Sequence, residues 1–193
     1  MKFKILGDHS KYHCGSNAVS KVIRNLIPKN SIWIEGDEEY DALIVNGEGS
    51  MHHSSPAFHQ KMKAIEKAQQ EGKKTFLINT VWEKNPNNYD KILLNLDGFN
   101  VRGFSSKYDL IKNHQIKVEE KIDFSFFANI DENAPYKDLR GSTVMTDIFS
   151  EKHGFMWLSD PLSDNWEKID MRKIEWSSMV KTLRTAGLLI CGR

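Results

Sequence analysis

Short apolar runs alternate with helix-like apolar stripes over the first half of the chain. Runs typical of strands lie at 3–6, 32–35, 42–45, 75–78 and 100–102. Between them, apolar residues recur at helical spacing in 19–27, 58–68, 89–96 and 108–111. This alternation predicts an α/β fold in which a Rossmann-like parallel sheet carries helices on both faces.

One helix and one strand of this pattern are especially well defined. The apolar residues of 19–27 are three and four positions apart, which is typical of one face of a helix, and Ser16 before them is a candidate N-cap. The run 42–45 is apolar throughout, as expected for a strand buried on both faces. Gly47 and Gly49 end that strand.

The periodicity is lost in the middle of the chain, where acidic, amide and proline residues cluster at 131–135. Such a cluster indicates a connection between domains. We therefore expect an N-terminal Rossmann-like domain at 1–125, a connection at 126–141 and part of a second Rossmann-like domain at 142–193.

The second domain repeats the α/β pattern only in part. Its expected strands lie at 144–146, 155–158 and 187–191, and its helix at 176–183. A strongly apolar strand such as 187–191 needs neighbours on both edges, so this unit looks incomplete. If that strand is an exposed edge, we expect the protein to self-associate through it as a homo-oligomer.

Composition narrows the classes of partner. The 193 residues carry 27 Lys plus Arg and 26 Asp plus Glu, a net charge of +1, so no global basic field favours nucleic acid or anionic membranes. Asp8 precedes any signal-type apolar region, and no stretch approaches the ~20 consecutive apolar residues of a spanning helix. Cys14 and Cys191 lie far apart without CxxC spacing, so a compartment that keeps thiols reduced is the simpler interpretation. We expect a cytoplasmic protein with no membrane span and no nucleic-acid partner.

Ligands of open α/β sheets bind beyond the carboxyl ends of the strands, which directs attention to the loop after the third strand. There Gly47 and Gly49 would let the main chain approach a ligand, Ser50 supplies a hydroxyl, and His52 and His53 titrate near neutral pH. These groups could hold an anion and move protons. The alternative is a tight turn in which the glycines only adopt positive φ and the histidines are solvated.

Glu48 is the least expected residue of this loop, because turn propensity poorly explains an acid between two glycines at a strand end. Its carboxylate could accept a proton from a hydroxyl group or bind a sugar hydroxyl. It could equally cap the following helix or pair with a lysine.

The loop after the first strand is a second candidate. Gly15, Ser16 and Asn17 lie where a helix starts, so a phosphate there would meet main-chain N–H groups and the positive end of the helix dipole. The alternative is an ordinary capped helix in which His13 and Cys14 only pack. The histidines and cysteine of both loops lack a helical i, i+4 pair or CxxC spacing, so we expect no metal site.

Two arginines could clamp a phosphate or carboxylate in a bidentate manner. Arg102 follows a predicted strand, with Ser105 three residues further on at a helix start, and Arg193 follows the last strand. The alternatives are a surface ion pair for Arg102 and an ordinary terminal residue for Arg193.

Assembled in order, these segments resemble the polysaccharide pyruvyl transferase family. The resemblance covers nearly the whole chain, and its most specific part is the glycine–acid–glycine block followed by paired histidines. The segments that carry it are HCGSNAV at 13–19, YDALIVNGEGSMHH at 40–53, KKTFLINTVW at 73–82, Arg102 with Ser105, and LLICGR at 188–193.

The resemblance implies a glycosyltransferase-B-like pair of Rossmann-like domains facing a cleft. It also implies transfer of a pyruvyl group from phosphoenolpyruvate to a saccharide acceptor as a ketal, with no other cofactor. Protonation of the donor's methylene carbon gives an oxocarbenium-like centre, which sugar hydroxyls capture while phosphate leaves. This chemistry needs an acid, a base and cationic anchors.

The resemblance assigns Arg193 to the donor's carboxylate or phosphate, whereas chemistry alone makes Glu48 and His52 candidates for proton transfer. The sequence departs from the family in two places. It ends at Arg193, where the family continues into a histidine-bearing segment and a helix, and its first loop reads CGSN instead of an Asn-x-Gly-Asp block. Two alternatives therefore stay open: a catalytically silent sugar or nucleotide-sugar binder on the same scaffold, and a nucleotide-sugar glycosyltransferase.

Overall fold

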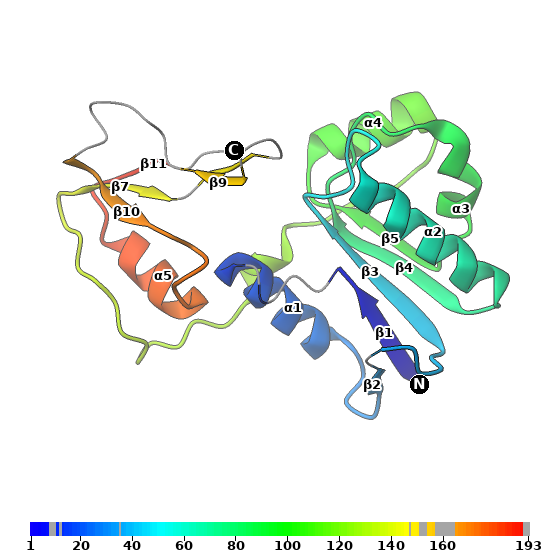
Figure 1. Ribbon diagram of the computed structural model, residues 1–193, viewed down its shortest axis with the longest axis horizontal. Coiled ribbons are helices and arrows are strands. Elements are labelled where there is room, and N and C mark those ends of the chain that lie inside the picture. The colour runs from blue at the N-terminus through cyan, green and yellow to red at the C-terminus, as the bar shows by residue number, and fades with distance from the viewer. Residues whose placement is uncertain are drawn as a thin grey trace. The chain divides into compact units, whose positions relative to one another are not determined.

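The computed structural model describes residues 1–7, 11, 13–34, 36–146, 148–150, 154–156 and 165–190 (Figure 1). They contain a six-stranded sheet in the order β2-β1-β3-β4-β5-β6, and every adjacent pair of strands in it is parallel. The strands are β1 (Lys2–Leu6), β2 (Ile32–Ile34), β3 (Ala42–Glu48), β4 (Lys74–Thr80), β5 (Gly98–Val101) and β6 (Glu119–Glu120). The predicted α/β class with a Rossmann-like parallel sheet is confirmed.

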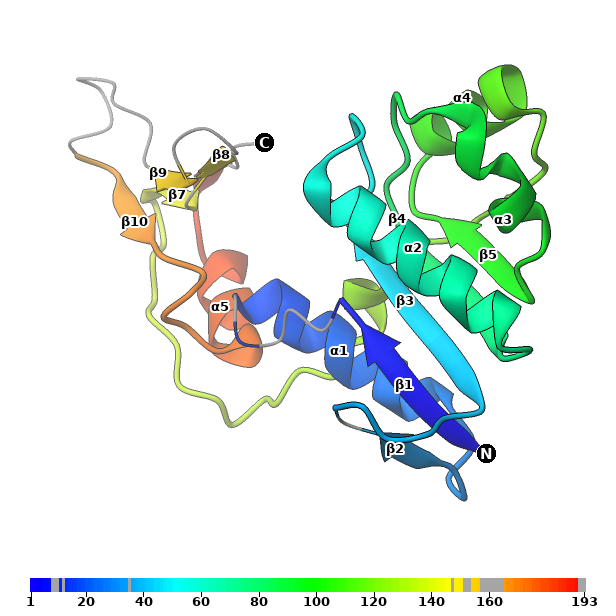
Figure 2. The same cartoon turned by 45° about the vertical axis from the view of Figure 1, so that its right-hand side comes forward.

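Helices connect most of these strands, whereas β2 passes to β3 without one. They are α1 (Cys14–Leu26), α2 (Pro56–Gln70), α3 (Asp90–Leu94) and α4 (Phe104–His114), with short 3₁₀ turns η1 (Asn87–Tyr89) and η2 (Phe124–Phe127). Both views show α2 running along β3 and β4 (Figures 1 and 2). No helix among the described residues is long and apolar enough to cross a membrane.

The core lies between α2 and the centre of the sheet. The strand β3 is buried from its first residue to Gly47, as its apolar run predicts. Its neighbours in the core include the fully buried side chains of Phe58, Met62, Ile65, Leu77 and Trp82. Each such side chain contributes about 1.5–3 kcal/mol to folding, so this cluster fixes α2 against the strand ends where ligands of such folds bind.

The start of α2 follows from its sequence. Ser55 is the N-cap, with its hydroxyl accepting a 3.2 Å hydrogen bond from the Phe58 N–H, and Pro56 occupies the first helical position. Gly72 adopts a left-handed conformation just after the helix ends. The local sequence thus determines both ends of α2.

The chain divides into two compact units. The first unit comprises Met1–Asp8 and Ile23–Phe126, and the second comprises His9–Val22 and Phe127–Arg193. The second unit therefore includes the first part of α1, which the apolar pattern did not indicate. The predicted boundaries at 125 and 142 stay predictions.

The second unit contains a smaller parallel sheet in the order β10-β7-β11. Its strands are β7 (Thr143–Thr146), β10 (Glu167–Ile169) and β11 (Leu188–Ile190), and its helix is α5 (Trp176–Arg184). A separate antiparallel pair joins β8 (Ile148–Ser150) and β9 (Gly154–Met156). The expectation of part of a second parallel α/β unit is met by this sheet.

Candidate functional site

The ammonium group of Lys61, on α2, lies buried beneath the loop that follows β3. It donates to the carbonyl oxygens of Asn46 at 2.8 Å and Gly47 at 3.3 Å, and to the Ser50 hydroxyl at 2.6 Å. Burial lowers the pKa of Lys61 to about 8, although the nearby Glu48 carboxylate acts in the opposite direction. The three donors of this cation are all used to hold the loop.

Asn46 holds the side chain of Glu48, and the main chain of Glu48 is left-handed. Its carboxylate accepts a 2.9 Å hydrogen bond from the side-chain amide of Asn46, which also donates to the carbonyl oxygen of Gly7 at 3.2 Å. Its main chain has φ 42°, a left-handed conformation that is costly for a residue other than glycine. The negative charge of Glu48 acts on the buried Lys61. Lys61 is thus the lysine with which the sequence suggested that Glu48 could pair.

The two glycines around Glu48 do not serve a positive-φ turn, because neither has a positive φ. The glycine part of that alternative is wrong, and the left-handed residue is Glu48 itself. The tight turn is present, because the Ser50 N–H donates to the Gly47 carbonyl oxygen at 3.2 Å. Gly47 is required by packing: a Cβ there would lie 1.4 Å from the Thr80 hydroxyl oxygen on β4. A Cβ at Gly49 would be 3.7 Å from a terminal nitrogen of Arg102, an ordinary contact that brings the guanidinium beside the loop.

Buried polar atoms without hydrogen-bond partners gather at this end of the sheet. Within the part of the chain that the structure describes, four such atoms are Asn46 Oδ1, Asn79 Nδ2, Thr80 Oγ1 and Arg102 Nε. They come from the carboxyl ends of β3 and β4 and from the residue after β5. Leaving such a group unsatisfied costs about 1–3 kcal/mol, so this end of the sheet carries an energetic cost that the rest of the fold offsets.

Arg102 is held in place by Asp123, through an ion pair in which a terminal guanidinium nitrogen donates to the carboxylate. Burial opposes ionisation of Asp123, but the Ser125 N–H and the Arg102 charge outweigh it and lower the pKa of this carboxyl below its usual value. The ion pair expected for Arg102 is thus present, but both side chains are mostly buried instead of lying on the surface. Ser105 is exposed in the first turn of α4.

The paired histidines lie at the far end of the same loop. The Nδ1 atoms of His52 and His53 are 3.0 Å apart, and their rings meet edge to face. The His53 N–H donates to the carbonyl oxygen of Glu83 at 2.8 Å, and the His53 ring is 3.8 Å from the Glu83 carboxylate. These contacts attach the β3 loop to the loop after β4. The contribution of either histidine to ligand binding stays a prediction.

The loop before α1 is closed by its own histidine. The Nδ1 atom of His13 accepts hydrogen bonds from the N–H groups of Gly15 at 2.9 Å and Ser16 at 3.3 Å. The helix begins at Cys14, so the expectation that Ser16 is the N-cap is wrong. The Asn17 N–H donates to the His13 carbonyl oxygen at 3.0 Å. A phosphate at this helix start would have to displace the His13 ring.

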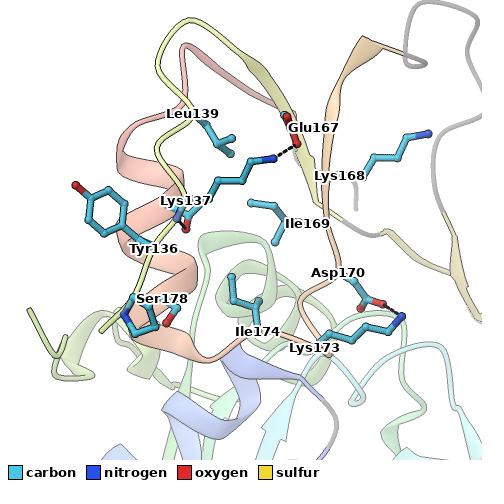
Figure 3. A pocket seen from close by; sticks show the side chains of 12 residues that line it. Tyr136, Lys137, Leu139, Glu167, Lys168, Ile169, Asp170, Lys173, Ile174 and Ser178 are labelled. Carbon is cyan, nitrogen blue, oxygen red and sulfur yellow. Dashed lines mark hydrogen bonds and ion pairs between the residues drawn. The ribbon is translucent and has the colours of Figure 1, made fainter. Parts of the chain in front are cut away.

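A cavity of about 470 Å³ lies in the second unit, between the segment 135–139, β10 and α5 (Figure 3). The apolar side chains of Leu139, Ile169 and Ile174 extend toward its interior, and a 2.7 Å ion pair joins Lys137 to Glu167 at one side. The residues that line it are Pro135, Tyr136, Lys137, Leu139, Glu167, Lys168, Ile169, Asp170, Lys173, Ile174, Ser178 and Thr182. None of the residues predicted from the sequence lines this cavity.

The structure thus brings Glu48, Gly47, Gly49, Ser50 and Arg102 together at one end of the first sheet. Arg193 lies outside the described residues. Among those that are described, no group of three or more His, Cys, Asp or Glu side chains could hold a metal ion. No family model, curated protein or solved structure matches this chain.

Sequence reasoning missed part of the site. Lys61 was not singled out, although it occupies a position within the apolar stripe of its helix, where a charged residue is unexpected. Asn46 and Asn79 are buried amides at the ends of apolar strands, which is a comparable signal. Asp123 could not have been found this way, because its partner Arg102 is 21 positions away in the sequence.

Proposed function

We propose that this protein is a transferase of the polysaccharide pyruvyl transferase type, which moves the pyruvyl group of phosphoenolpyruvate to a saccharide acceptor. The observation that carries the proposal is the meeting of Glu48, Lys61 and Arg102 at the carboxyl end of one parallel sheet. Phosphoenolpyruvate is a cytoplasmic metabolite, so this function would be exercised in the cytoplasm.

The donor set suits a small anion with several oxygens. The Arg102 guanidinium lies beside Gly49, and its fork of N–H groups matches carboxylate or phosphate oxygens. Lys61 donates its three hydrogen bonds to Asn46, Gly47 and Ser50, so it would attract an anion through its charge alone.

The reaction assigns distinct tasks to the loop residues. A proton goes from an acid to the methylene carbon of phosphoenolpyruvate, and a sugar hydroxyl attacks the resulting cationic carbon while a base takes its proton. The bond between that carbon and the phosphate oxygen then breaks, and a second sugar hydroxyl bonds to the carbon to close the ketal while its proton passes to the departing phosphate. Glu48 and His52 are our candidates for these proton transfers. The role of Arg193 toward the donor's carboxylate or phosphate rests on the resemblance alone.

Two other functions use the same features. The anchors that would hold phosphoenolpyruvate could also hold the diphosphate of a nucleotide sugar, either in a glycosyltransferase or in a protein that binds without turnover. Catalytic turnover separates an enzyme from a binder. The identity of the anion that binds separates the two transferases.

Calorimetric titration tests the proposal directly. Phosphoenolpyruvate is titrated into the protein in parallel with inorganic phosphate, pyruvate and a panel of nucleotide sugars. We expect saturable binding of phosphoenolpyruvate, weakened at least tenfold by Arg102→Gln and unchanged by Lys63→Gln, an exposed lysine on α2. Preferential binding of a nucleotide sugar would overturn the donor assignment.

Turnover is tested with the full-length protein. Phosphate release and a pyruvylated sugar, detected by mass spectrometry, are the expected products with phosphoenolpyruvate and a suitable acceptor. Glu48→Gln should abolish them while donor binding persists. Absence of pyruvylated product with every acceptor tested would refute the pyruvyl transferase and leave the nucleotide-sugar glycosyltransferase and the silent binder.

A further inference from the structure

A hydroxyl, an imidazole and a phenol form a continuous chain at the start of α2. The Ser54 Oγ atom lies 2.7 Å from Nε2 of His59, and Nδ1 of the same ring lies 3.0 Å from the hydroxyl of Tyr89. The three residues come from the β3 loop, from α2 and from η1. None of them belongs to the anion site proposed above.

The main chain presents Ser54 in an unusual way. Its φ of 53° is left-handed, although serine gains nothing intrinsic from that region, and its side chain is exposed. The Ser54 N–H donates to Asn85 Oδ1 at 3.0 Å, and the buried Asn85 donates in turn to the carbonyl oxygen of Met51 at 2.8 Å. A strained residue that its surroundings hold in place is frequent at catalytic positions.

The imidazole of His59 is held on both sides. Its ring packs edge to face on the fully buried Phe58 and lies 5.8 Å from the ring of Tyr89, which is only 8% exposed. When Nδ1 carries the proton and donates to the Tyr89 oxygen, Nε2 is an acceptor aimed at the Ser54 hydroxyl. This is the arrangement of a nucleophile, a base and an orienting group.

We propose that Ser54 is an activated nucleophile for acyl transfer from small activated esters, with His59 as its general base and Tyr89 as a positioning residue. The Ser54 oxygen forms a bond to the ester carbonyl carbon, and its proton passes to His59 Nε2. The bond to the leaving alcohol breaks as that alcohol takes the proton from His59. Water then removes the acyl group by the same route and restores the serine.

Exposure suits this role better than a purely structural one. The helix is already capped by Ser55, whose hydroxyl bonds to the Phe58 N–H, so the Ser54 hydroxyl is not needed for that purpose. A small ester can reach an exposed hydroxyl without displacing core residues. The activity is independent of phosphoenolpyruvate, so the failure of either proposal leaves the other standing.

The first test uses the intact chain and a fluorophosphonate probe, which forms a phosphorus–oxygen bond to an activated serine with loss of fluoride. Peptide mass spectrometry should locate one adduct at Ser54. Ser54→Ala should remove it and His59→Gln should slow labelling roughly 100-fold. Ser177→Ala is the matched control. The Ser177 hydroxyl accepts a hydrogen bond from the main-chain N–H of Asp131 and has no imidazole partner in the chain proposed here, so its removal should leave labelling unchanged.

The second test separates positioning from structure. Hydrolysis of p-nitrophenyl acetate should show a burst of nitrophenol, and Tyr89→Phe should lower kcat about fivefold without changing KM or the melting temperature. The ring of Tyr89 stays in the core in that variant, so a change confined to kcat reports the lost hydroxyl. Labelling distributed over several serines, or an undiminished rate in His59→Gln, would overturn the proposal.

Discussion

Lys61 and Asn46 are joined by a 2.8 Å hydrogen bond from the ammonium group to the main-chain carbonyl oxygen near the end of β3. This bond ties α2 to the strand from which the candidate site begins. Because the same ammonium also holds Gly47 and Ser50, the position of the loop depends on one buried cation. Helix, loop and site should therefore respond together when Lys61 changes.

Replacing Lys61 by methionine should destabilise the protein. The unbranched side chain of methionine replaces the lysine chain up to its ammonium group, but two carbonyl oxygens and the Ser50 hydroxyl lose their donor, at a cost of about 1–3 kcal/mol in the free energy of unfolding. Urea unfolding measures this, and Lys63→Met on the exposed side of α2 is the control. If the two variants unfold at the same urea concentration, the loop does not depend on the cation.

The lowered pKa of Lys61 predicts a pH dependence with a definite sign. Between about pH 8 and the model-peptide value of 10.5, folded Lys61 has lost its proton while the unfolded chain still holds it. Stability rises with pH wherever the unfolded state binds more protons. The difference in unfolding free energy between the native protein and Lys61→Met should therefore grow over this interval. A constant or shrinking difference would contradict burial of the charge.

Gly47 and Gly49 should differ sharply when each is changed to alanine. A methyl group at Gly47 would overlap the Thr80 side chain, and the nearest main-chain atom is only 3.0 Å away, so we expect a loss of about 1–3 kcal/mol or failure to fold. Gly49→Ala meets only an ordinary contact and should unfold within about 0.5 kcal/mol of the native protein. Thermal unfolding of the pair decides this, and equal losses would refute the packing explanation.

The first sheet could be predicted from the sequence because its signals are local. The apolar run of β3 and the capped, Pro-started helix α2 are specified by neighbouring residues. Gly47 and Glu48 were found for the same reason, since they end a strand. The sequence did not show why position 47 must be glycine, because the group that leaves no room for a side chain there is the hydroxyl of Thr80, on another strand.

The remaining features depend on distant parts of the chain. The burial of Lys61 follows from the packing of α2 on β3, and the pairing of Arg102 with Asp123 follows from the return of the chain after β6. His13 was considered as a packing residue and as a possible metal ligand but not as a cap, because the spacing of a sequence does not show which nitrogen of an imidazole meets a main-chain amide. Tertiary geometry supplies these contacts.

The second sheet should promote self-association through β11. In the sheet as described, β11 pairs only with β7, and Leu188 and Leu189 are 56% and 41% exposed. An exposed apolar edge strand is a template for another strand. Light scattering at high concentration should detect dimers or larger species, and Leu189→Lys should reduce them. Leu94→Lys, a change at an exposed leucine on α3, should not. A native protein that stays monomeric would contradict the prediction.

The cap of α1 by His13 gives the last prediction. Two main-chain N–H groups, those of Gly15 and Ser16, depend on the imidazole Nδ1, so His13→Ala should leave both without their acceptor. Loss of an N-cap costs about 1 kcal/mol, whereas asparagine at the same position supplies an oxygen of similar reach. Thermal unfolding followed by circular dichroism should therefore rank the proteins as native, His13→Asn and His13→Ala in order of decreasing stability. An alanine variant as stable as the asparagine variant would mean that the imidazole contacts are incidental to the helix.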